Sequence, residues 1–146
     1  MKIRVLFLCS CALFLTSCDS LHYKQYVIRD ASFEDRETVS AVLANVARVA
    51  TLEEVTVESS VPKILAYYEE KPEIQSSFKV WLGARMLNED LIIDLSCFYP
   101  GWNPPPVYKS AETDLFQELS KMFGERLIIN PQPKIPFSET PKPNME

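Results

Sequence analysis

The sequence predicts an α+β domain in which two amphipathic helices cover one face of a mainly antiparallel sheet. Apolar residues recur at helical spacing in two stretches, residues 33–51 and 110–123. Between them, residues 77–86 and 91–99 alternate between apolar and polar side chains, and an Asn-Glu-Asp turn separates them. A chain of 146 residues with this pattern fits a single domain and a modest core.

The first elements follow a short polar segment. Residues 19–25 have the composition of a tether, and we expect the first strand at residues 26–29. Ser32 can cap the helix that follows, with acidic residues in its first turn. That helix is predicted over residues 33–51 from an apolar stripe formed by Val39, Val42, Leu43, Val46, Val49 and Ala50.

The middle of the chain is less regular. Residues 53–59 alternate and predict a strand. Residues 62–70 fit two structures, a short helix begun by Pro62 or a strand rich in aromatic and β-branched side chains. The pattern leaves that choice open, and Pro72 ends the element in either case.

The predicted hairpin has one apolar and one mixed face. Its first strand places Phe78, Val80, Leu82 and Ala84 on one side, and Lys79, Trp81, Gly83 and Arg85 on the other. A glycine inside a strand indicates a bulge or the close approach of another segment. Residues 100–106, which contain four prolines, form a stiff loop after the hairpin.

A second helix and a last strand complete the domain. Ser110 is the expected cap, Phe123 the expected end, and Gly124 a suitable C-terminal stop. A short apolar strand follows at residues 127–129. The order of elements is β-α-β-β-α-β, as in ferredoxin-like folds, with an insertion at about residues 53–73.

The first residues resemble the signal of a bacterial lipoprotein. Two basic residues precede an apolar run, residues 5–15, that is shorter than the roughly 20 residues needed to span a bilayer. The sequence Leu-Thr-Ser-Cys then ends at Cys18 and resembles the lipobox, the motif at which lipoproteins are processed. The resemblance implies cleavage of residues 1–17 and a diacylglyceryl thioether on Cys18, usually with an acyl chain on the new amino group.

The resemblance also implies a location. In enteric bacteria, an aspartate after the lipidated cysteine resembles a signal for retention in the inner membrane, and Asp19 occupies that position. We therefore expect a lipid-anchored protein on the periplasmic side, with the inner membrane favoured over the outer. The predicted organisation is a signal peptide (1–17), an anchor and tether (18–25), an α+β domain (26–130) and a proline-rich disordered tail (131–146).

Charge and cysteine content limit the partners. The formal net charge is −5, and loss of the signal would remove two basic residues and no acidic one. Such an acidic chain is a poor candidate for binding nucleic acid, and its membrane contact would depend on covalent lipid. After processing, Cys97 alone keeps a free thiol, so an intramolecular disulfide is excluded. We expect that thiol to be buried and inert, with a reactive or intermolecular thiol as the alternative.

Few catalytic groups are present. The single histidine, His22, lies on the predicted tether, so a serine-histidine-acid triad or a zinc site rich in nitrogen and sulfur is not expected. The chain has no glycine-rich phosphate loop. Two acidic clusters, Glu69-Glu70-Glu73 and Glu89-Asp90, remain, and both are interpreted as solvated surface. We therefore expect no cofactor, no metal and no enzymatic activity.

Aromatic residues are the candidates for partner binding. Trp102 lies in the stiff proline loop, between Tyr99 and Tyr108. A rigid loop lowers the entropy cost of presenting an aromatic side chain to a partner. Trp81 lies on the mixed face of the hairpin, with Lys79 and Arg85. For all of them the alternative is an ordinary structural role.

These observations favour a non-enzymatic envelope lipoprotein whose domain binds another protein near the membrane. An immunity or inhibitor lipoprotein that protects against a secreted toxin is the alternative. The sequence identifies no specific partner for either function.

Overall fold

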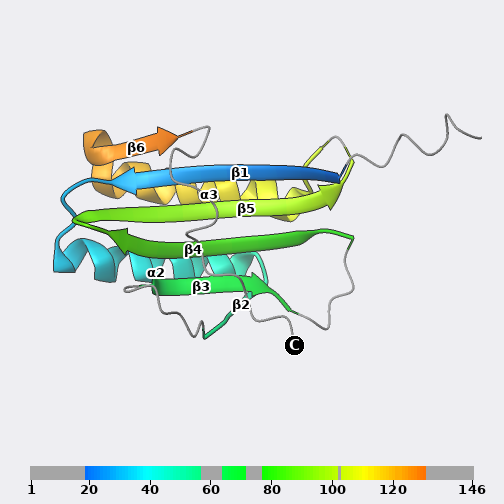
Figure 1. Cartoon of the computed structure of the whole chain (residues 1–146), viewed down its shortest axis with the longest axis horizontal. Coiled ribbons are helices and arrows are strands. Elements are labelled where there is room, and N and C mark those ends of the chain that lie inside the picture. The colour runs from blue at the N-terminus through cyan, green and yellow to red at the C-terminus, as the bar shows by residue number, and fades with distance from the viewer. Residues whose placement is uncertain (1–18, 57–63, 72–76, 102, 131–146) are drawn as a thin grey trace, which may run out of the picture.

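The computed structural model describes residues 19–56, 64–71, 77–101 and 103–130, without the side chain of Asp19. The elements are β1 (Asp19–Ile28), α2 (Phe33–Val49), β2 (Leu52–Glu54), β3 (Ile64–Glu70), β4 (Lys79–Leu87), β5 (Asp90–Pro100), α3 (Pro106–Phe123), the 3-10 turn η1 (Gly124–Arg126) and β6 (Leu127–Asn130). Figure 1 shows the strands forming one sheet with both helices on the same face. The predicted α+β class is confirmed.

The sheet is antiparallel throughout, and its strand order is β2-β3-β4-β5-β1-β6. Without β2 and β3, the order is β4-β5-β1-β6. Here β5 lies between β1 and β4, which run in the same direction as each other. This is the split β-α-β arrangement of the ferredoxin-like prediction. The predicted insertion supplies nearly all of β2 and the whole of β3, which extend the sheet beyond β4.

The core lies between the helices and the sheet. Buried side chains of α2 (Val39, Leu43, Val46) and α3 (Leu115, Leu119) pack toward the inward residues of β4 and β5. Cys97 is a fully buried member of this core, as the sequence predicts. Within the described ranges, no helix combines the length and apolar character needed to cross a bilayer.

The predicted tether at residues 19–25 is wrong. These residues form most of β1, which pairs with β5 from Asp19 opposite Pro100 onward. The sequence pattern did not predict this strand because its side chains are polar. In the fold, these side chains find their partners on other elements. Lys24 forms an ion pair with Glu112 of α3, and the ring of His22 packs against Tyr99.

The second helix begins earlier than Ser110. Residues 105 and 106 are prolines at the N-cap and first helical positions, where a missing N–H costs little. The N–H of Tyr108 already donates to the carbonyl of Pro105 at 3.1 Å. Gly124 ends the helix with a φ of 51°, in the left-handed region that favours glycine.

In the middle of the chain, the ambiguous segment is a strand, β3. Of the strand predicted at residues 53–59, the described part contains β2 and one further hydrogen bond, from the Val55 N–H to the Tyr67 carbonyl. Residues 57–59 lie outside the described part. Gly83 accommodates a close approach, as expected. A Cβ atom there would lie 3.1 Å from Cδ2 of Tyr67, so the tyrosine ring occupies the space above the glycine.

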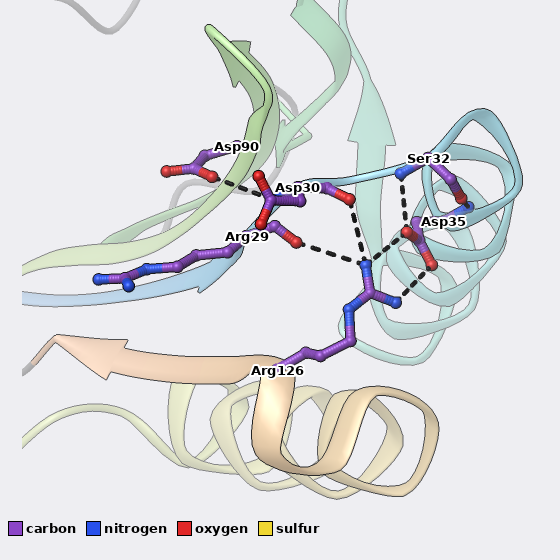
Figure 2. A network of polar contacts seen from close by, with 6 residues as sticks. All are labelled: Arg29, Asp30, Ser32, Asp35, Asp90 and Arg126. Carbon is purple, nitrogen blue, oxygen red and sulfur yellow. Dashed lines mark hydrogen bonds and ion pairs between the residues drawn. The ribbon is translucent and has the colours of Figure 1, made fainter.

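Arg126, on the turn η1, links the last part of the chain to the segment between β1 and α2. Figure 2 shows its guanidinium between Asp35 and the loop before α2. It donates to Asp35 at 2.7 Å and to the carbonyls of Arg29 and Asp30, each at 3.4 Å. Asp35 also accepts from the Ser32 N–H, which completes a capping box at the start of α2.

The electrostatic consequence is a depressed pKa. The hydrogen bond from Arg126, followed by those from Ser32, lowers the pKa of Asp35 from its ordinary 3.8 to about 2. A group with a lowered folded-state pKa stabilises the fold above its unfolded pKa, and this contribution is lost as the pH falls through the folded value. Asp35 therefore stabilises the fold above about pH 4.

Arg126→Gln should lower the free energy of unfolding measurably at pH 7. The loss should be small, because the Arg126 side chain is 49% exposed and solvent weakens the pair. Urea unfolding should show most of the difference from the unsubstituted protein disappearing between about pH 4 and pH 2. Arg48→Gln, which removes an exposed cation within α2, is the control; an equal loss in both variants would contradict this role of Arg126.

Candidate functional site

One face of the sheet carries no helix in the described part of the chain, and we call it the helix-free face. Cross-strand register places its side chains in rows that run from β1 across β5 to β4. The rows are Leu21–Phe98–Lys79, Tyr23–Ser96–Trp81, Gln25–Asp94–Gly83 and Val27–Ile92–Arg85. Figure 1 looks onto this face, with the helices behind it.

A buried polar network lies at the centre of this face. Asp94 accepts hydrogen bonds from the Tyr23 hydroxyl, from Gln25 Nε2 at 2.9 Å and from Arg85 Nε at 3.4 Å. The oxygen of the Gln25 amide in turn accepts from Asn130 Nδ2 at 3.4 Å. The network therefore links four strands, β6, β1, β5 and β4, through their side chains.

The charges of this network compensate each other. Asp94 and Arg85 form an ion pair that is almost fully buried. Such a pair is costly to desolvate, and removing one partner leaves an uncompensated charge. Burial, followed by the Asp94 charge and its hydrogen bond, raises the pKa of the Tyr23 hydroxyl. Tyr23 is therefore a neutral donor that holds the carboxylate and is not activated as a base.

Trp81 is half-buried on this face, next to the polar network. Its neighbours in register are Ser96 on β5 and Glu69 on β3. The structure places Lys79 and Arg85 on the same face, as the hairpin pattern predicts. Only Lys79 is exposed, because Arg85 is committed to the pair with Asp94.

Two other predicted contact residues are core residues. Tyr99 and Tyr108 are only 3% and 2% exposed, so they cannot form a partner surface together. They lie against the exposed ring of His22, whose centroid is 5.4 Å from that of Tyr99 and 6.0 Å from that of Tyr108. Sequence reasoning missed this grouping because it took residues 19–25 for a tether. Trp102 lies outside the described residues.

The acidic residues of these clusters that the structure describes do not form paired carboxylates across a cleft. Glu69 faces Trp81 on the helix-free face, whereas Glu70 follows it on the alternate face, opposite Leu52. Glu73 lies outside the described residues. At the hairpin turn, the Asp90 carboxylate accepts a hydrogen bond from the Asp30 N–H at 3.2 Å. Among the described residues, no group of three histidine, cysteine or acidic side chains could hold a metal ion.

A mainly apolar groove of about 180 Å³ lies between the end of α2, the edge of the sheet and the start of α3. It is lined by Ala50, Thr51, Leu52, Glu70, Phe78, Val80 and Val107. These residues come from separate elements that only the tertiary fold brings together, so no sequence motif could reveal the groove.

Comparisons of the chain with protein-family models, curated proteins and solved structures find no match.

Breaking the Asp94–Arg85 pair on one side should destabilise the fold strongly. We expect Asp94→Leu and Arg85→Met each to lower the free energy of unfolding by about 3 kcal/mol, because each removes the ion-pair partner of a buried charge. The double variant should cost clearly less than the sum of the two, as measured by urea unfolding. Lys79→Met, on the same face, should change the stability by less than about 0.5 kcal/mol. Additive losses would contradict a coupled pair.

Proposed function

We propose that this chain is a lipid-anchored protein of a bacterial envelope, held by Cys18 on the periplasmic side of the membrane. Its helix-free face binds a protein partner through Trp81. The observation that carries the partner site is the position of Trp81, half-buried on a sheet face without a helix and beside a network that fixes its neighbours.

The surroundings of Trp81 are rigid, and this favours binding. A tryptophan contributes most to binding when its surroundings are already ordered, because little side-chain freedom is then lost on association. Ser96 is buried, and Tyr23 in the same row is hydrogen-bonded to Asp94. The surface next to Trp81 is thus preorganised by buried polar contacts. The carboxylate of Glu69, opposite Trp81 on β3, adds a directional polar contact.

The same surface suits a secreted toxin as the partner, which is the immunity function considered from the sequence. The two functions differ in their biological readout. A strain lacking the protein becomes sensitive to sibling cells only if the partner is a toxin.

Cys18→Ser should abolish the anchor. The sulfur that carries the thioether is lost, so the variant should remain an unprocessed precursor and incorporate no palmitate analogue during metabolic labelling. Cys11→Ser, upstream of the proposed cleavage point, is the matched control and should be labelled normally. A Cys18→Ser variant that is still processed and labelled would refute the anchor. In an enteric host, Asp19→Ser should move the protein to the outer membrane fraction.

Trp81→Ala should weaken partner binding at least tenfold. Truncating a central tryptophan at an interface commonly costs 2 kcal/mol or more. The measurement is quantitative recovery of the crosslinked partner from detergent-solubilised membranes. Phe116→Ala is the control, because Phe116 is an exposed aromatic residue on α3, and this helix covers the opposite face of the sheet. Equal recovery with both variants, at unchanged circular dichroism, would exclude Trp81 from the interface.

A further inference from the structure

The end of the sheet at which β1 begins carries exposed apolar side chains. Leu21 is 56% exposed and Phe98 is 39% exposed, although both are large and hydrophobic. They face each other across the β1–β5 pair, and the exposed Lys79 of β4 lies next to Phe98 in the same row. An apolar, an aromatic and a cationic side chain thus stand together at one end of the helix-free face.

The position of this row relative to Cys18 is unusual. β1 is paired with β5 from Asp19 onward, so the chain has no flexible spacer between the lipidation site and the sheet. Leu21 is three positions after Cys18, and an extended chain covers at most about 3.6 Å per residue. Leu21 therefore lies within about 11 Å of the backbone of Cys18.

These distances match the dimensions of a membrane surface. The polar interfacial layer is about 5 to 7 Å thick on each side of the hydrocarbon core. Side chains that bind at an interface reach about 5 to 10 Å into the boundary between headgroups and acyl chains. A domain attached directly at Asp19 can therefore bring the row of Leu21, which follows the Asp19–Pro100 pair in register, to this layer.

We propose that the row Leu21–Phe98–Lys79 is a membrane-contact surface, which docks the end of the sheet on the lipid bilayer that receives the acyl chains. This inference rests on the proposed lipid anchor. Leu21 and Phe98 enter the interfacial layer, as the leucine and phenylalanine side chains of interfacial helices do, and Lys79 contacts anionic headgroups. The contact fixes the orientation of the domain, so that the axis of β1 rises from the membrane.

The orientation has a consequence for the partner site. Trp81 lies one row farther from the membrane than Lys79, because it follows two residues later on β4. A strand rises about 3.3 Å per residue, so Trp81 lies about 7 Å above the docked row. The partner of the helix-free face would therefore bind close to the headgroups.

The test uses the full lipidated protein, reconstituted in vesicles of phosphatidylethanolamine and phosphatidylglycerol that contain some brominated lipid. Leu21→Cys and Phe98→Cys are labelled separately with an environment-sensitive thiol dye. Phe33→Cys is the control, because Phe33 is 70% exposed and lies beyond the opposite end of β1. Cys97 should stay unlabelled, because burial and then the Glu70 charge raise its pKa to about 12. The unsubstituted protein serves as the labelling blank.

We expect several-fold stronger quenching of the label at positions 21 and 98 than at position 33. Lys79→Glu should at least halve the quenching at position 21, since it places an anion against anionic lipid. Equal quenching at positions 21, 98 and 33 in membrane-bound protein would overturn the docked orientation while leaving the anchor intact. Unchanged quenching in Lys79→Glu would overturn the part assigned to Lys79. Protein that does not stay with the vesicles would overturn the anchor, and this inference with it.

Discussion

The pairing of β1 with β5 is the interaction on which the rest of the structure depends. It extends over the whole length of β1, from Asp19 opposite Pro100 to Ile28 opposite Leu91. On its other edge, β1 also pairs with β6, so that the first and last strands meet at one side of the sheet. The antiparallel ladder satisfies backbone groups that a tether would leave to water. It also brings the beginning of the domain directly to the proposed lipid anchor.

Polar side-chain contacts add to this frame at two places. At one end, Arg126 binds Asp35 and the carbonyls of the loop before α2, which joins the last elements to the first helix. At the centre of the helix-free face, the Asp94 carboxylate links β1, β4 and β5. Both sites use charged groups to fix geometry, and at the buried Asp94 site a charge tolerates few arrangements of its partners. The rows around Trp81 are therefore held in place by interactions that are not themselves at the surface.

Particular residues show where sequence reasoning succeeded and where it failed. The helix from Phe33 and the hairpin around Asn88 were predictable, because apolar periodicity and local cap or turn residues agree there. The strand over residues 19–25 was missed because its polar side chains find partners on α3 and β5. Tyr99 and Tyr108 were taken for surface residues because they flank a proline loop, although the fold places both in the core.

The sequence by itself determined the α+β class, the two amphipathic helices and the burial of Cys97, and its residues 15–18 carry the resemblance to a lipobox. Each of these follows from the spacing of residues within one segment or from a contiguous motif, so no knowledge of distant contacts is needed. The tertiary structure alone decided which polar residues are paired, which aromatic residues are exposed, and where β1 begins. Those outcomes depend on cross-strand register and on neighbours as many as 105 positions away along the chain, such as Gln25 and Asn130. Periodicity along one segment carries no information about such contacts.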